Sequence, residues 1–376
     1  MSITVKEVTD RKGLQAFIRF PYRLYKQHPC FIPPLQLDEE GTLRKDKNPA
    51  FDYCDARYWL AYKDGKVVGR IAGIVNQAYI QKWKRRYIRF GWIDFEDDER
   101  IAKALIKKVE EWGKSLYMQA VHGPLGFTDL DHEGVLVEGF DHPGTIAALY
   151  NHAYYPDLLE KAGYRKDTDW LEYKITIPTV MDERLEKLAI TVQRRQKLQA
   201  VRLHKTKDVL PYVPAIFDLL NTAYADLYGV VPLTQKQIQY YTKQYFSFIH
   251  PDFISLITDN EGKLAAFSIT MPSLSKALQK ANGKLFPLGF WHLLKALKKN
   301  NKADLLLIAV RMDLQGKGVN AVLMYETLKS YLKNGITIAE AGHQLEDNKQ
   351  VQAMWDYFDA GVHKRRRCYI KYLDKE

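Results

Sequence analysis

Cysteine is scarce in this chain of 376 residues, which holds three of them: Cys30, Cys54 and Cys368. An odd, widely separated set does not suit the disulfide framework of a secreted domain, and it argues against a cysteine-ligated zinc site. The chain also lacks any run of about twenty apolar residues, the length that a helix needs to span a bilayer. We therefore expect reduced thiols, no resident metal and no membrane span.

The lack of a secretory signal and of nucleic-acid motifs limits which cellular compartment and which binding partners the sequence predicts. The N-terminal sequence MSITVKEVTDRKG has no apolar core of the secretory kind, so a cytoplasmic location is predicted. The net charge of +11 is compatible with nucleic acid, anionic lipid or a phosphate-bearing cofactor. However, the densest basic clusters, residues 364–367 and 82–86, lie in no nucleic-acid motif. We interpret them as solvated surface and expect neither a nucleic-acid nor a membrane partner, and no pattern bears on the oligomeric state.

The most informative stretch is residues 303–333. Its apolar run, residues 305–310, is typical of a buried strand, and a polar turn at residues 311–317 follows. Apolar residues then recur from Val319 to Leu332 at mostly three- and four-residue spacing, which predicts a helix.

The junction between this strand and this helix reads Gln-Gly-Lys-Gly at residues 315–318. Glycines let a backbone approach a ligand closely, and the first amides of a helix have no partner inside it. A strand, a glycine-rich turn and a helix N-terminus therefore predict an anion site, most often for phosphate. The spacing fits neither a nucleotide P-loop nor the dinucleotide fingerprint.

The junction resembles the acyl-CoA site of the GNAT acetyltransferase superfamily, whose members carry Gln/Arg-x-x-Gly-x-Gly/Ala after a strand that often ends in Val-x-Pro. Here Val310 ends the strand, and the match covers residues 315–318 and Val319. It departs at Met312, where proline is common, and at Asn320, where a small residue is usual.

The order of predicted elements occurs twice along the chain. Hairpin glycines Gly65 and Gly262 are separated by almost the same offset as Gly163 and Gly361, each of which is expected to follow a helix. Two landmarks at one offset indicate a tandem repeat. The repeated order is that of the GNAT fold, so the resemblance implies an α/β protein of two tandem GNAT-like domains, each with a mixed, largely antiparallel sheet.

We divide the chain into an N-terminal domain of residues 1–177, a helical connector of residues 178–200 and a C-terminal domain of residues 201–376. The expected elements include a helix over 12–27 that Pro21 should break or kink, a loop over 28–55, hairpins over 58–75 and 253–271, a helix over 97–117, a strand over 201–204, a helix over 235–248, an inserted helical segment over 273–300 and a helix over 349–358.

The matching junction of the first half carries four carboxylates, Glu96, Asp97, Asp98 and Glu99. They suit a helix N-terminus, but they would repel a pyrophosphate. We predict that the first half binds no acyl-CoA and instead packs on the second half and walls the substrate cleft. The turn at residues 122–127 and the acidic loop after it either face that cleft or form a surface turn.

The resemblance implies cofactor contacts at named positions. Backbone groups of Ile308, Ala309 and Val310 would hold pantetheine, and the amides of Gln315, Gly316, Lys317, Gly318, Val319 and Asn320 would take the pyrophosphate. Asn348 would contact the pantetheine arm or cap a helix, and capping needs no cofactor.

In this family an amine attacks the thioester with the help of a base, and an acid, often a tyrosine, protonates the thiolate. Counting forward from Asn348 places that tyrosine position on Trp355, and counting back from Gly361 places it on Tyr357. Only Tyr357 can serve as the acid. The candidates for the base are Glu340 and His343, with Glu346 and Asp347 close behind in sequence.

The sequence therefore favours an acyl-CoA-dependent N-acyltransferase that uses acetyl-CoA or another acyl-CoA at its C-terminal half, with an unknown small-molecule or peptide amine as acceptor. Two alternatives stay open: a catalytically silent GNAT-like binding or scaffold protein, and an aminoacyl-tRNA-dependent transferase of tandem GNAT fold. The aromatic-rich insert at residues 283–300 would form an acceptor pocket or a lid, or pack on the sheet.

Overall fold

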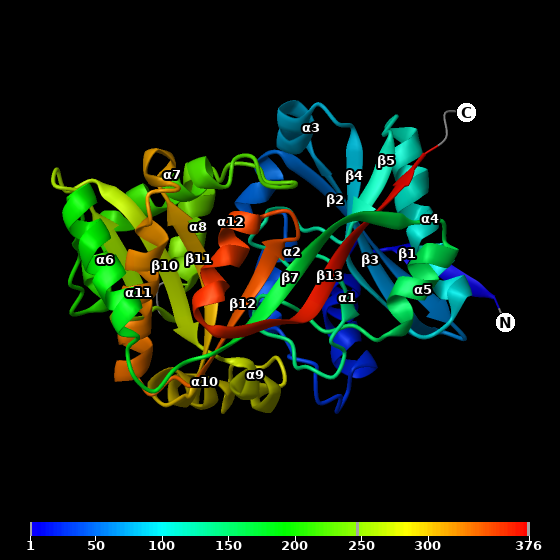
Figure 1. Ribbon diagram of the computed structural model, residues 1–376. Helices are drawn as coiled ribbons and strands as arrows, with labels where there is room; N and C mark the ends of the chain where they lie inside the picture. Colours follow the sequence, from blue (N-terminus) through cyan, green and yellow to red (C-terminus); the bar gives the residue numbers. More distant parts are fainter. Residues whose placement is uncertain (1, 246–247, 374–376) are drawn as a thin grey trace. The chain divides into compact units, whose positions relative to one another are not determined.

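The computed structural model describes residues 2–245 and 248–373 (Figure 1). They form two compact units that are not continuous in sequence. Unit 1 comprises Met1–Leu171, Ser275–His292 and Lys364–Glu376, and unit 2 comprises Glu172–Leu274 and Leu293–His363. The division of the chain at residues 177 and 200 therefore stays a prediction about the repeat, whereas these units describe which residues pack together.

Unit 1 is built on a five-strand path that is antiparallel except at its last pair. Its strands lie in the order β1-β2-β3-β4-β5, and β4 and β5 run parallel. The elements are β1 (Ile3–Glu7), α1 (Arg11–Leu24), α2 (Gln36–Leu43), η1 (Pro49–Asp52), β2 (Cys54–Lys63), β3 (Lys66–Asn76), α3 (Gln77–Trp83), β4 (Tyr87–Phe95), α4 (Glu99–Ser115), β5 (Ala120–Gly123), β6 (Val135–Glu138), α5 (Tyr154–Lys161) and α9 (Ser275–Ala281).

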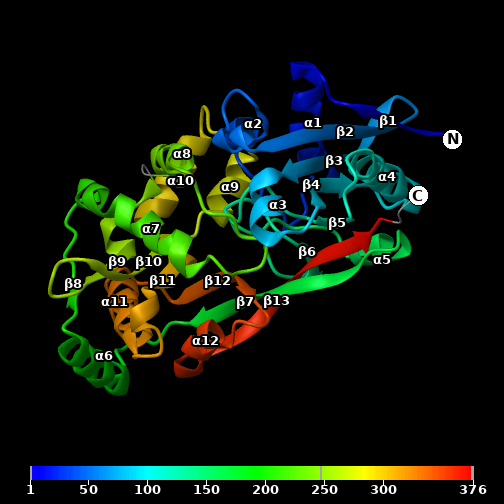
Figure 2. The same ribbon diagram turned by 90° about the horizontal axis from the view of Figure 1, so that it is seen from above.

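Helix α4 lies across strands β1 to β4 and closes the main core of unit 1 (Figures 1 and 2). Its apolar face, with Ile101, Leu105, Val109 and Trp112, is buried against the sheet, as the three- and four-residue spacing predicts. Gly69 permits this packing, since a Cβ there would lie 2.7 Å from a Leu105 methyl group.

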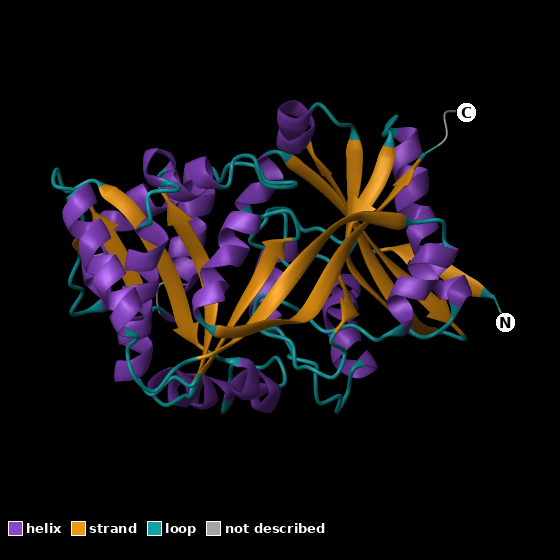
Figure 3. Ribbon diagram, viewed as in Figure 1, coloured by secondary structure: helices purple, strands orange, loops and turns teal. Residues whose placement is uncertain are grey.

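Unit 2 repeats the same arrangement with strands in the order β8-β9-β10-β11-β12. Figure 3 distinguishes the helices and strands of both units by colour. Its elements are α6 (Glu183–Gln196), β8 (Gln199–Ala200), η2 (Thr206–Tyr212), α7 (Val213–Ala223), α8 (Gln235–Tyr245), η4 (Pro251–Phe253), β9 (Ile254–Thr258), β10 (Leu264–Pro272), β11 (Lys302–Val310), η5 (Met312–Leu314), α11 (Val319–Lys333), β12 (Ile338–Leu345), α12 (Lys349–Gln352) and η6 (Ala353–Tyr357). Three elements, β7 (Arg165–Thr176), α10 (Gly289–Lys298) and β13 (Asp359–Tyr372), cross the boundary between the units.

The strand pairing confirms the tandem fold. In unit 1 the parallel ladder of β4 and β5 ends at Arg89, and a register shift follows in β4 before Asp94. In unit 2 the parallel ladder of β11 and β12 ends at Leu305, and the register with β10 then skips Leu306. In each unit the parallel ladder is short and a bulge follows it, so the two strands diverge beyond the ladder: β4 from β5, and β11 from β12.

Several expected elements are confirmed, and others are wrong. The hairpin glycines Gly65 and Gly262 both adopt a left-handed conformation, with φ of 77° and 78°. Helix α1 continues through Pro21 to Leu24, and the expected loop at residues 28–55 contains α2 and η1. No strand forms over residues 201–204, because β8 is limited to Gln199–Ala200.

The repeat landmark at Gly361 is also wrong. The predicted helix over 349–358 is a four-residue helix followed by the 3-10 turn η6, and Gly361 lies inside β13 rather than after a helix. Only Gly163 of that pair has the left-handed conformation that ends a helix, with φ of 87°. The predicted helix over 235–248 is confirmed as far as Tyr245, and residues 246–247 lie outside the described residues.

Among the described residues, none of the helices combines the length and the apolar character that crossing a bilayer requires.

Candidate functional site

The glycine turn of unit 2 opens helix α11. Gly316 and Gly318 both have positive φ, 72° and 82°, and Gly318 is the N-cap of the helix. Residues 315–318 are exposed, whereas Val319, which follows them, is buried. The predicted strand, turn and helix are therefore present, and α11 begins at an exposed turn, the kind of place where an anion binds.

Arg311 fixes the start of this turn. Its guanidinium donates to Asp313 at 2.7 Å and to Asp259 at 2.8 Å, and Asp259 belongs to the β9–β10 hairpin turn. The hydrogen bonds to Asp313 and Asp259 raise the pKa of Arg311, which is charged in any case. Because Arg311 is engaged on both sides, Lys317 is the cation of the turn that stays exposed for a phosphate.

Helix α6 supports α11 from the side (Figure 1). Tyr325 of α11 donates to Glu186 of α6 at 2.9 Å, and a Cβ on Gly318 would lie 3.0 Å from a Val192 methyl group. The predicted helical connector therefore packs along the helix that opens at the glycine turn.

The splay between β11 and β12 exposes strand backbone, but side chains partly cover it. The Tyr224 hydroxyl, just after α7, donates to the Ile308 carbonyl at 3.0 Å and accepts from the Ile308 N–H at 3.4 Å. The Gln315 side chain donates to the Val310 carbonyl at 3.1 Å. Ala309 instead pairs with Phe267 on β10. The three residues expected to hold pantetheine are thus in the splayed part of the strand, with two of them capped.

The base candidates lie on β12 at different places. Ala339 and Ala341 belong to the core beneath α11, so Glu340 between them points to the other face of the sheet. There its carboxylate lies 3.6 Å from His363 Nε2, on β13 within unit 2. His343 has a positive φ of 52°, which marks a local kink of β12.

The structure does not bring Tyr357 to Glu340. Tyr357 is 65% exposed at the end of η6. Trp355 is buried and donates its indole N–H to Gln344 at 2.9 Å. Asn348 caps α12 by accepting from the Val351 N–H at 3.3 Å, the role that needs no cofactor.

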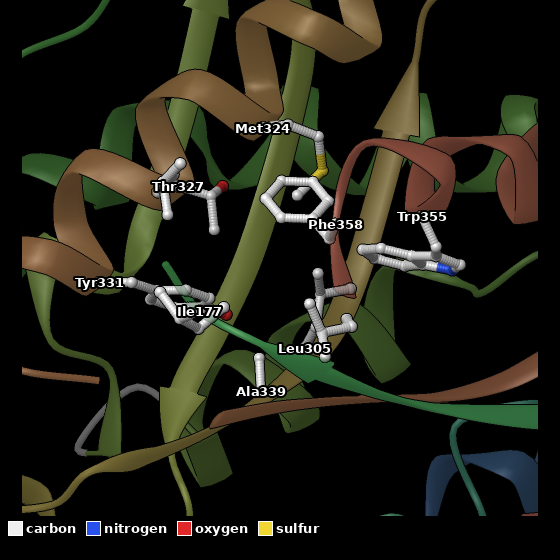
Figure 4. A pocket seen from close by; sticks show the side chains of 10 residues that line it. Ile177, Leu305, Met324, Thr327, Tyr331, Ala339, Trp355 and Phe358 are labelled. Atoms are coloured by element: carbon white, nitrogen blue, oxygen red, sulfur yellow. The ribbon is translucent and has the colours of Figure 1, made fainter. Parts of the chain in front are cut away.

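A small pocket of about 10 Å³ lies between α11, β11, β12 and η6 (Figure 4). Met324 and Phe358 meet at one end of it, with Trp355 beside them, while Ala339 lies at its floor. No charged side chain lines it, and its volume is about what a single water molecule needs.

The corresponding region of unit 1 is closed by its own residues. Asp98 caps α4, and its hydrogen bond from Arg100 holds the pKa of this carboxyl below its usual value. At the end of β4, the Phe95 N–H donates to the Tyr155 hydroxyl at 3.0 Å, and the Tyr154 hydroxyl donates to the Phe95 carbonyl at 2.6 Å. That unit 1 binds no acyl-CoA remains a prediction, and these contacts agree with it.

One group within the described residues offers metal ligands. His122, Asp167 and Cys368 of unit 1 place one ligand atom each within 4.8 Å of one another. Burial lowers the pKa of His122, which keeps its imidazole neutral. Structural zinc sites take four ligands, and this group supplies three. The expectation of no resident metal therefore stays a prediction, which elemental analysis of the purified protein would test.

Sequence reasoning missed Tyr224 and His363. Tyr224 lies more than eighty positions from Ile308, and nothing in its own helix pattern marks it as polar and inward-facing. His363 directly precedes the basic cluster at residues 364–367, which was predicted to be solvated surface. That prediction is wrong for Lys364 and Arg366, which are each only 1% exposed. Their proximity to Ile308 and Glu340 is a product of the tertiary fold.

Comparisons with known proteins complete the description. No protein-family model matches the chain. It is 28% identical over 376 residues to Protein YghO from Escherichia coli (strain K12), an alignment that covers 98% of this chain and 95% of that protein. It is 27% identical over 383 residues to the bacterial ceramide synthase from Caulobacter vibrioides (strain NA1000 / CB15N), with 99% and 98% covered.

Among solved structures, the chain is similar to a tandem GNAT protein from the clavulanic acid biosynthesis pathway, solved without AcCoA. The two superpose with a TM-score of 0.57 and 12% sequence identity, and the match covers 100% of both chains.

Proposed function

Because the chain has the tandem GNAT fold, we propose that it is an N-acyltransferase that binds an acyl-CoA at the glycine turn of unit 2. The observation that carries the proposal is the splay of β11 from β12 immediately before the exposed turn at residues 315–318. If Tyr224 and Gln315 release Ile308 and Val310, backbone groups of the strand and of the helix N-terminus could bind one extended, phosphate-bearing ligand. Unit 1 offers no such turn at the start of α4.

In the proposed reaction the acceptor nitrogen attacks the thioester carbonyl. The C–N bond forms, the C–S bond breaks, and the sulfur leaves as the CoA thiol after it takes a proton. The Ile308 N–H would polarise the carbonyl. The Glu340–His363 pair would accept the proton that the amine loses, with His343 as the alternative base, and Tyr357 stays the candidate acid for the thiolate.

For the acceptor we propose a long-chain amino alcohol. A ceramide is the amide of such an amine with a fatty acid, and the similarity to a ceramide synthase extends over nearly the whole of both chains. The acyl group would then be a fatty acyl chain, with the acetyl group as the shortest case.

Calorimetry with acetyl-CoA, palmitoyl-CoA and CoA tests the cofactor site. Lys317→Glu should weaken binding about tenfold or more, since a hydrogen bond to a charged group is lost and repulsion added. Lys243→Glu on α8 makes the same charge change at another exposed position and should bind as the native chain does. Both are preferable to a Gly318 variant, which would also disturb Val192. Equal loss in both variants, or no binding by the native chain, would refute the site.

Mass spectrometry of reactions with palmitoyl-CoA tests the acceptor. An amide should form with a long-chain 2-amino-1,3-diol and not with short amines of the same head group. Acylation of the short amines alone would keep the transferase but reject the lipid acceptor.

A second candidate, a silent GNAT-like binding protein, is favoured by the Tyr224 and Gln315 contacts, which cap backbone that a cofactor would need. It predicts that the native chain binds neither CoA nor acyl-CoA. The same calorimetry therefore decides between the two candidates.

A further inference from the structure

An insert joins β10 to β11, and it has an unusual composition. Residues 273–302 contain seven lysines and no aspartate or glutamate. Near its middle the sequence reads Leu-Phe-Pro-Leu-Gly-Phe-Trp, residues 285–291. The insert forms helix α9, a connecting loop and helix α10 (Figure 2).

The apolar side chains of the connecting loop and of the first turn of α10 face solvent. Phe286 is 68% exposed, Leu288 65%, Phe290 42% and Trp291 68%. They are one cluster rather than scattered residues, because the Phe286 and Phe290 rings lie 6.5 Å apart and Phe290 and Trp291 are likewise 6.5 Å apart. We call Phe286, Leu288, Phe290 and Trp291 the aromatic tip. Contiguous exposed apolar surface of this kind marks an interaction site.

The base of the insert is anchored, so the tip is held in place. In unit 1 the Gln279 side chain donates to the Pro29 carbonyl at 2.7 Å, and the Gln36 N–H donates to the Gly283 carbonyl at 2.9 Å. A Cβ on Gly283 would lie 2.1 Å from the Tyr22 ring, which shows how closely the loop is packed there. Packing thus ends at Gly283, and the exposed tip follows within a few residues.

Exposed lysines flank the tip on both sides in sequence. Lys276 and Lys280 share a face of α9, and Lys284 follows in the loop. Later in the sequence, Lys295 and Lys298 are exposed four and seven residues after Trp291. Apolar and aromatic residues beside a row of lysines, with no acid among them, form the pattern of a helix that lies in the interface of an anionic bilayer.

We propose that this insert docks the protein onto the surface of an anionic lipid bilayer. The aromatic tip enters the boundary between head groups and acyl chains, and the flanking lysines contact the lipid phosphates. The partner is a lipid surface rather than a nucleic acid, because Leu288 has no face on which a base stacks, whereas it adds apolar area to a bilayer insertion. The proposal goes beyond the transferase activity and does not depend on it.

Vesicle flotation of the full chain tests the proposal. The native chain should float with vesicles of phosphatidylglycerol and phosphatidylcholine and not with phosphatidylcholine alone, and added salt should release it. Phe286→Ser with Trp291→Ser should abolish flotation, because the buried apolar area is lost. Lys280→Glu with Lys284→Glu should lower the bound fraction at least tenfold, since each lysine near an anionic surface contributes about fivefold.

Matched controls keep the test specific. Tyr117→Ser removes another exposed aromatic ring of unit 1, and Lys66→Glu with Lys161→Glu makes the same charge change at exposed sites outside the insert. Both should float as the native chain does, and circular dichroism should show all variants folded. Flotation that survives loss of the tip, or that is lost equally in the controls, would overturn the proposal. The proposal would also be overturned if the native protein does not bind vesicles but binds single-stranded oligonucleotides through the lysines.

Discussion

At the scale of single residues, the Tyr224 hydroxyl accepts a hydrogen bond from the Ile308 N–H. This is the N–H group that we propose polarises the thioester carbonyl. A carbonyl oxygen that accepts from that N–H would also lie beside the hydroxyl, so Tyr224 would supply a second donor to the developing oxyanion. We expect Tyr224→Phe to lower kcat about a hundredfold or more with little change in the affinity for acyl-CoA.

Single-turnover kinetics and calorimetry together check this prediction. The matched control is Tyr212→Phe, because the Tyr212 hydroxyl makes no hydrogen bond to another of the described residues. If Tyr224→Phe instead binds acyl-CoA more tightly and keeps its kcat, the hydroxyl only occupies the gap between β11 and β12 and competes with the ligand.

Asp131 of unit 1 provides a residue-scale prediction about pH. Its carboxylate accepts from the Phe127 N–H at 2.8 Å and the Thr128 N–H at 3.1 Å. Burial raises the pKa of Asp131 to about 7, although these two N–H groups favour the charged form. The folded state therefore holds the proton more tightly than the unfolded state, and this carboxyl lowers stability as pH rises from about 4 to about 7.

Asp131→Asn keeps an acceptor for both N–H groups and carries no charge. Its free energy of unfolding should match that of the native chain near pH 4 and exceed it above about pH 7. Urea unfolding across that range measures the difference, with exposed Asp157→Asn as the control. Parallel profiles for Asp131→Asn and the native chain would show that this carboxyl does not titrate in the window.

At the scale of elements, alanine substitutions in the glycine turn distinguish the cost of backbone strain from the cost of a steric contact with α6. Gly316→Ala meets only the cost of a left-handed conformation, about 1 to 2 kcal/mol, because no atom lies within 4 Å of its Cβ. Gly318→Ala carries the same cost and also presses on Val192 of α6. We expect Gly318→Ala to be the more destabilising, with Val192→Ala recovering the excess in the double variant. Urea midpoints for five chains, the native protein, the three single variants and the double variant, would show it, and additive effects would mean that α6 does not pack tightly on the turn.

Elements with a clear period or a clear turn could be predicted from the sequence. The glycine pairs at Gly65 and Gly262 and the apolar spacing of α4 are local signals, and both hairpins and the helix are present. The helix expected over 349–358 was wrong because its spacing is short and ambiguous, and tertiary contacts such as the Trp355–Gln344 hydrogen bond decide its form. Helix α2 was not predicted, because the prolines around it are typical of a loop.

The candidate site could be predicted only where it is local in sequence. The turn at residues 315–318 is one continuous motif, and its conformation is as expected. Tyr224 and His363 reach Ile308 and Glu340 across long stretches of chain, so no spacing rule could find them. The exposure of the aromatic tip was equally hidden, since its residues alone fit a buried core as well as a surface.

At the scale of the whole molecule, unit 1 depends on the end of the chain. Within unit 1, the final residues of β13 pair with β5, with Tyr369 opposite Gly123, and with β6, with Arg366 opposite Leu136. The Lys364 ammonium also donates to the Pro143 carbonyl at 3.1 Å. A fragment of residues 1–177 lacks all of this and would leave the edge of β5 open, which invites aggregation.

We therefore expect a chain truncated after residue 358 to lose the cooperative unfolding of unit 1, even though the deletion lies at the far end of the sequence. A chain that ends at residue 373 keeps β13 and should unfold as the native protein does. Residues 1–177 should be insoluble alone and soluble when co-expressed with residues 178–376. Solubility and urea unfolding measure both effects. A stable, cooperatively folded 1–177 fragment would instead mean that the predicted boundary at residue 177 delimits an independent domain, with β13 an addition to a sheet that is already complete.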